Sequence, residues 1–148
     1  MDVEGEFLLP ATPKQVWQRL NDPEVLVRCI PGCARMTRLD AQNFECEIRV
    51  SYGFINASFM TLLVLSNICP PDSYTLTGRS QGGLAGFGEG VADVWLVAAK
   101  QGTTLRYAAR LSASGRIAQL GSRLLRSTTR RLTEKFFAAF AASFVDEI

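Results

Sequence analysis

The side chains that could do chemistry are four cysteines and fourteen carboxylates, because the 148-residue sequence contains no histidine. Without histidine there is no Ser-His-Asp triad, no Cys-His pair and no histidine general base. Cys29 and Cys33 are spaced like two metal ligands, but a zinc site needs a second pair, and Cys46 and Cys69 stand apart. We therefore expect free thiols in a reducing cytosol, and no metal site.

Glu89 and Asp93 are the best-placed candidates for acid–base chemistry. In a strand predicted over residues 85–99 they share one parity, opposite Gly88 and Gly90, so they are expected to point outward. Burial of either carboxylate beside Tyr107 or Arg106 would instead favour an enzyme. The glycine-rich run 82–90 lacks the Lys-Ser/Thr of a phosphate loop. The sequence thus predicts no catalytic residue.

Apolar periodicity predicts the elements that position these side chains. Thr12-Pro13 and Asp22-Pro23 are typical of helix starts, and each begins a short amphipathic helix. Elsewhere a period of two, broken by turn residues, predicts strands over 3–9, 34–40, 43–51, 54–67, 73–81, 85–99 and 102–113. Short breaks imply antiparallel neighbours. The fold class is α+β: a curved seven-stranded antiparallel sheet with two short helices after the first strand.

One long amphipathic helix is predicted from Arg116 to about Phe144, laid across the concave face of the sheet. Phe137 and Phe144 lie off its main apolar stripe. Four arginines recur at spacings of three, four and seven and are the expected partner-binding residues: Arg116, Arg123, Arg126 and Arg130. Between Arg116 and Lys135 the only acid is Glu134, so we expect these arginines to contact an acidic protein or an anionic membrane.

Small residues on the inner parity of the sheet predict a cavity beneath this helix, because glycine leaves room where a side chain would pack. Sharp sheet curvature without a ligand is the alternative. The expected ligand-binding residues, taken from strand parity and helical phase, are Phe44, Ile48, Phe59, Leu76, Gly90, Tyr107, Leu120 and Leu124. The phase of 62–65 is hidden by continuous apolar residues.

Several segments, in order, resemble the CoxG family of carbon monoxide dehydrogenase proteins, a branch of the START-like helix-grip (SRPBCC) superfamily. They cover nearly the whole chain: Asp22-Pro23-Glu24, Cys29-Ile30-Pro31-Gly32-Cys33, Gly86-Phe87-Gly88-Glu89-Gly90, 102–107 and 115–121. The resemblance implies one START-like ligand-binding domain over 1–148. It also implies a non-catalytic accessory protein of a molybdenum hydroxylase, binding an apolar quinone- or lipid-like ligand and assisting membrane recruitment or electron hand-off. No covalent cofactor is expected.

The competing interpretation is an enzyme of the polyketide-cyclase or aromatase kind, which shares the superfamily fold and needs polar groups converging in the cavity. The net charge of +2 gives no indication of nucleic-acid binding. The acidic N-terminus is unlike a signal peptide, which predicts a cytoplasmic protein, peripheral on the membrane if recruited there. Longer family members carry a C-terminal membrane-contacting tail, whereas this sequence ends at Ile148.

Overall fold

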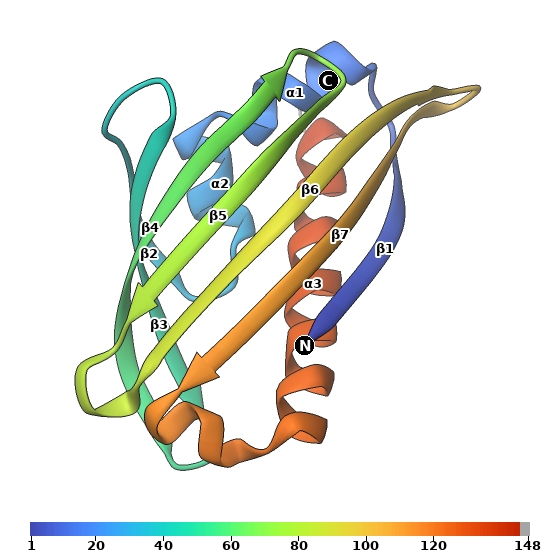
Figure 1. The fold of residues 1–148 in the computed structure, drawn as a ribbon. Coiled ribbons are helices and arrows are strands. Elements are labelled where there is room, and N and C mark those ends of the chain that lie inside the picture. The colour runs from blue at the N-terminus through green and yellow to red at the C-terminus, as the bar shows by residue number, and fades with distance from the viewer. Residues whose placement is uncertain (146–148) are drawn as a thin grey trace.

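The computed structural model describes residues 1–145, and only the backbone of Tyr52; residues 146–148 of the predicted domain lie outside it. One antiparallel sheet has the order β1-β7-β6-β5-β4-β3-β2. Its strands are β1 (Asp2–Leu9), β2 (Cys33–Arg38), β3 (Asn43–Tyr52), β4 (Ile55–Cys69), β5 (Ser73–Gln81), β6 (Phe87–Ala99) and β7 (Gly102–Ser114). The sheet curves around the C-terminal helix α3 (Ser122–Val145), and α1 (Pro13–Leu20) and α2 (Pro23–Cys29) cover one end (Figure 1). The predicted fold class is confirmed.

The two short helices begin where their capping residues predict. The Thr12 side chain accepts a hydrogen bond from the Gln15 amide at 3.3 Å, and the Gln15 side chain accepts one from the Thr12 amide at 2.9 Å. Asp22 accepts from the Glu24 amide at 2.9 Å. These bonds satisfy amides that a helix leaves without internal partners. They fix both helices against the sheet end that holds the core.

The prediction of one helix from Arg116 is wrong. Residues Gly115–Leu120 form a separate 3₁₀ turn, η2, and α3 begins at Ser122. Gly121 between them has φ of +88°, a left-handed conformation that glycine tolerates and that interrupts a right-handed helix. The apolar spacing continued across the break, so periodicity alone did not reveal it.

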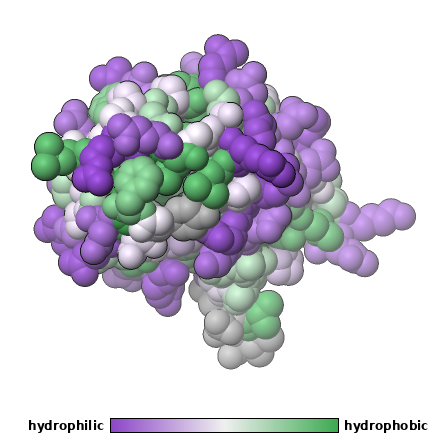
Figure 2. Space-filling view, turned by 90° about the horizontal axis from the view of Figure 1, so that it is seen from below, coloured by the Kyte–Doolittle hydropathy of each residue, from purple (hydrophilic) through white to green (hydrophobic). Residues whose placement is uncertain are grey.

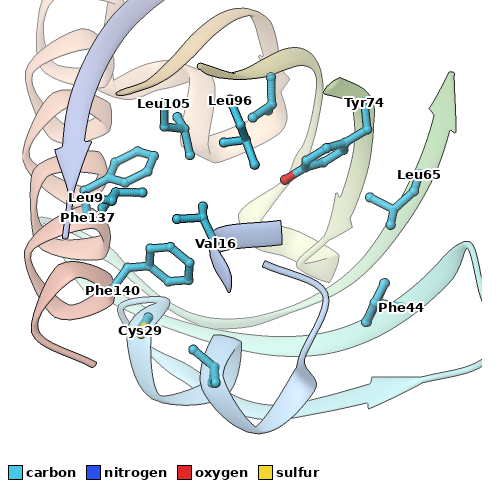
Figure 3. Close-up of a cluster of buried hydrophobic side chains, with 12 residues drawn as sticks. Leu9, Val16, Cys29, Phe44, Leu65, Tyr74, Leu96, Leu105, Phe137 and Phe140 are labelled. Carbon is cyan, nitrogen blue, oxygen red and sulfur yellow. The ribbon is translucent and has the colours of Figure 1, made fainter. Parts of the chain in front are cut away.

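Large side chains fill the space between sheet and helix at the α1–α2 end. Phe140 of α3 and Leu9 of β1 are 0% exposed, as is Val16 of α1. Figure 3 shows Phe137 and Phe140 projecting from α3 toward this cluster. Phe137 stacks on Phe7 with ring centroids 4.1 Å apart. Phe137 thus belongs to the core, and Phe144 packs against it too.

Side-chain size falls along the sheet, away from this core. On the inner face of β6 the residues run Leu96, Val94, Ala92, Gly90, Gly88, and only Leu96 and Val94 are buried. The paired positions of β5 run Tyr74, Leu76, Gly78, Ser80 in the same direction. Helix α3 follows the same trend from Phe140 to Thr129 to Ser122. Small residues therefore face one another at the far end, where the packing opens.

A second, smaller cluster closes that far end. It contains Ile55, Phe59 and Ala85, with Ile117 and Leu120 of η2 packed against it. The short turn η1 (Gly83–Ala85) lies against η2, and Gly86 approaches Gly115 so closely that a Cβ on Gly86 would collide with the Ser114 carbonyl. The region between the two clusters is left for a cavity.

Candidate ligand-binding site

A cavity of about 710 Å³ lies between the inner face of the sheet and the first half of α3. Its sheet wall is built from inward-facing residues of four strands: Thr61, Leu63, Leu76, Gly78, Ser80, Gly88, Gly90, Ala92, Leu111 and Ala113. Ile117 and Leu125 face them from η2 and α3. The volume is within the range of small-molecule sites, which are mostly apolar with a few polar groups.

The cavity reaches an edge of the sheet that β1 does not cover. The pairing of β1 with β7 ends at Asp2 opposite Arg110. Leu111, Ser112 and Ala113 of β7 continue beyond that point and line the cavity. Arg126 of α3 also lines it and donates a hydrogen bond to the Asp2 carbonyl at 3.1 Å.

The wall's main polar feature is a pair of hydroxyls on neighbouring strands. Thr61 Oγ1 and Ser80 Oγ lie 2.7 Å apart, and either can be the donor. Thr61 is 5% exposed. Burial raises the pKa of the adjacent Cys46 thiol to about 12, while a hydrogen bond with Thr61 acts in the opposite direction. Cys46 is therefore a neutral thiol at physiological pH.

Of the eight predicted ligand-binding residues, Leu76 and Gly90 line this cavity. Phe44 is buried in the core at the α1–α2 end, and Phe59 is buried in the small cluster at the opposite end. Strand parity placed both on the correct face but said nothing of their position along the strand. They and Ile48 do not line the cavity.

The three remaining predicted residues are also outside this wall. Tyr107 lies under β1, where a Cβ on Gly5 would meet its ring at 3.0 Å, and it lines a narrower groove with Arg130. Burial raises the pKa of Tyr107, and the Glu134 carboxylate adds to the rise. Leu120 packs on the small cluster, and Leu124 is half-buried. The helical phase used for these two leucines was set across the break at Gly121.

Sequence reasoning missed Thr61, Ser80, Gly78 and Gly88 as wall residues. The glycines carried a signal, since they lie on the parity of Gly90 on adjoining strands. Thr61 and Ser80 could be found only by pairing β4 with β5, which the continuous apolar run 62–65 obscures. The structure resolves that run, because Leu62 is 40% exposed while Leu65 is buried.

The candidate acid–base residues lie on the outer face, as predicted. Glu89 is exposed and pairs with Arg79 at 3.8 Å. Asp93 is exposed and accepts a hydrogen bond from Thr75 at 2.8 Å. Neither carboxylate side chain is directed at the inner wall, so the arrangement favours ligand binding over acid–base chemistry.

The four predicted partner-binding arginines do not share one helix. Arg116 belongs to η2, where its guanidinium lies 5.6 Å from the centroid of the Phe54 ring. Arg123, Arg126 and Arg130 lie on α3 and are exposed. The break at Gly121 separates Arg116 from the other three.

The cysteines do not converge. Cys29 and Cys46 are buried, Cys33 is half-buried and Cys69 is exposed, all as free thiols. Within residues 1–145 no three Cys, Asp or Glu side chains gather to hold a metal ion. The absence of a metal stays a prediction.

Comparison with solved structures identifies the fold. A conserved protein from Geobacillus kaustophilus superposes with a TM-score of 0.91 at 23% identity, covering 99% of this chain and 96% of that one. Protein CV1439 from Chromobacterium violaceum gives 0.74 at 14% identity, with 95% of each chain covered. Ara h 8.0201 gives 0.70 at 14% identity, with 99% of each chain covered. No curated protein matches the sequence. These structures support the helix-grip fold.

The family model for the carbon monoxide dehydrogenase protein CoxG matches residues 5–144. The match spans every strand pairing that builds the cavity and most of α3. A match to this model implies an accessory role beside a carbon monoxide dehydrogenase. We conclude that this chain belongs to the CoxG family of carbon monoxide dehydrogenase proteins.

Proposed function

We propose that this chain is a non-catalytic carrier that binds an apolar, quinone- or lipid-like molecule for a carbon monoxide dehydrogenase-type molybdenum hydroxylase. The observation that carries the proposal is the cavity of about 710 Å³ between sheet and helix. Leucine, alanine and glycine dominate its sheet wall, which suits a hydrocarbon ring or chain. The outward-facing Glu89 and Asp93 argue against the cyclase alternative.

The proposal predicts that the purified protein carries an extractable apolar molecule or takes one up. Native mass spectrometry of freshly purified protein should give an adduct that disappears after organic extraction. The extracted protein should then bind 2-methyl-1,4-naphthoquinone with one-to-one stoichiometry in a calorimetric titration. Absence of both the adduct and the titration would contradict ligand carriage.

We further propose that the end of the molecule formed by η1, η2 and the β3–β4 turn docks on an anionic membrane. Phe54 is 51% exposed and Leu84 is 89% exposed there, on two separate turns. Segments 51–57, 80–88 and 112–127, which build this end, contain three arginines and no acid. Figure 2, seen from this end, shows apolar side chains gathered among hydrophilic ones.

Apolar tips beside arginines fit a bilayer surface, since the tips enter the headgroup boundary while cations attract anionic lipid. No helix in the described part of the chain is long and apolar enough to span a bilayer. The docking surface is at the cavity's end of the molecule, because Ile117 of η2 both lines the cavity and packs beside this end. A ligand would thus travel a short way between membrane and cavity.

Replacing Phe54 and Leu84 together by serine should weaken binding to vesicles containing anionic lipid by at least about tenfold, because each lost apolar contact is worth more than about 1 kcal/mol. Co-sedimentation with vesicles measures the effect. The matched control replaces Leu8 and Leu39, which are 55% and 54% exposed elsewhere, by serine. Equal losses in both double variants, or wild-type binding by the first, would refute the docking surface.

A further inference from the structure

We infer that the Thr61–Ser80 hydroxyl pair recognises one oxygen atom of the bound ligand and accepts that oxygen either as a carbonyl or as a hydroxyl. The inference rests on the proposed function, because it assumes that an apolar molecule enters the cavity. It adds a chemical requirement. The ligand is an apolar body that carries a carbonyl–hydroxyl couple, held in one orientation.

The position of the pair supports this assignment. Among the inward-facing sheet residues of the described chain that line the cavity, only Thr61 and Ser80 have polar side chains. They occupy paired positions on β4 and β5, with Leu63 and Gly78 beside them toward the core. A ligand oxygen that left water for this wall would meet a hydrogen-bonding partner at one place on it.

Other polar groups of the cavity are already engaged. The Thr129 hydroxyl donates to the Leu125 carbonyl at 2.8 Å within α3. Arg126 donates to the Asp2 carbonyl at 3.1 Å. Ser122 is exposed at the start of α3. The hydroxyl pair is thus the polar group on the sheet wall that keeps hydrogen-bonding capacity for a ligand.

The pair can present either a donor or an acceptor. Each hydroxyl has one proton and two lone pairs, and the contact at 2.7 Å uses only one proton. When Thr61 donates to Ser80, the Ser80 proton is available to a ligand carbonyl. When Ser80 donates to Thr61, the Thr61 proton turns to the Cys46 thiol, and Ser80 accepts from a ligand hydroxyl.

This reversal requires only rotation of O–H bonds. Thr61 is fixed by burial at 5% exposure, and Cys46 behind it is 2% exposed. The backbone and the cavity shape therefore stay the same for both forms of the ligand. A site of this kind binds the oxidised and reduced members of a quinone–quinol couple with similar affinity, as a carrier that loads one form and releases the other would require.

The test compares three probes of similar size: 2-methylnaphthalene, 2-methyl-1-naphthol and 2-methyl-1,4-naphthoquinone. The double variant Thr61→Val/Ser80→Ala should bind the naphthol and the quinone about two- to tenfold more weakly for each lost hydrogen bond, and bind the hydrocarbon as the wild type does. The control Ser58→Ala/Thr77→Val removes one serine and one threonine hydroxyl from the outer face of the same two strands. It should bind all three probes unchanged.

The outcomes separate this inference from the proposed function. If wild-type protein binds none of the probes, ligand carriage itself fails. If it binds them and the double variant loses affinity for the hydrocarbon equally, or for the oxygenated probes not at all, the hydroxyl pair is not the recognition point. If only the quinone or only the naphthol is affected, the pair has a fixed direction and the exchange of donor and acceptor roles is overturned. Thermal unfolding of each variant verifies that the fold is retained.

Discussion

Replacing Gly88 and Ala92 together by phenylalanine is expected to abolish uptake of apolar ligands while the fold remains intact. Both positions lie on the inner face of β6 and line the cavity. A Cβ on Gly88 would meet no atom nearer than the Ser112 carbonyl oxygen at 3.8 Å, so a side chain there enters open space. Two rings would occupy the volume that a ligand needs.

We expect the apparent dissociation constant for 2-methyl-1,4-naphthoquinone to rise at least tenfold, which corresponds to about 1.4 kcal/mol or more. The melting temperature should stay the same or rise, because filling space in a strand that carries glycine removes a weakness. The control Leu62→Phe/Val97→Phe adds the same two rings on the outer face, where both positions are exposed. Undiminished binding by the Gly88 and Ala92 variant would mean that the ligand lies elsewhere.

Replacing Phe140 by alanine is expected to cause the largest loss of stability. Its side chain is 0% exposed, and its ring lies 5.6 Å from that of Phe136 and 5.2 Å from that of Phe144. Removing a buried phenylalanine ring costs about 3–5 kcal/mol, because apolar contacts are lost and a void remains. For a domain of this size the melting temperature should fall by on the order of 10 °C.

Urea unfolding followed by circular dichroism measures this loss. Leu132→Ala on the same helix is the matched control, since Leu132 is 41% exposed and its loss should cost less than about 1 kcal/mol. Similar losses for both variants would contradict the assignment of Phe140 to the core. The contrast also tests the register of α3 against the sheet.

The strands could be predicted because alternation of side chains reports which face of a sheet is buried. Val94 and Leu96 are buried and Trp95 is 42% exposed, as the parity of the sequence indicates. The starts of α1 and α2 could be predicted because Thr12 and Asp22 cap them through bonds within a few residues. Such signals are local, so they are legible without a tertiary structure.

The last helix shows where local signals fail. Its apolar spacing extends back through Ile117 and Leu120, yet both residues belong to η2. Since Gly121 interrupts the helix, a phase set before it does not carry over to the residues after it. The inward face of α3 consequently includes Phe137 and Phe144, which the stripe drawn from Arg116 left to one side.

The sequence by itself determined the order of elements, the face that each strand residue presents and the absence of histidine chemistry. Only the tertiary structure decided where along each strand the interior is filled and where it is open. Parity gives Phe44 and Leu76 the same side of the sheet, but Phe44 lies in the closed core and Leu76 lines the cavity. The difference arises from what stands opposite, namely aromatic side chains from one half of α3 and small ones from the other. That pairing depends on how distant segments align, which no periodicity within a single segment records.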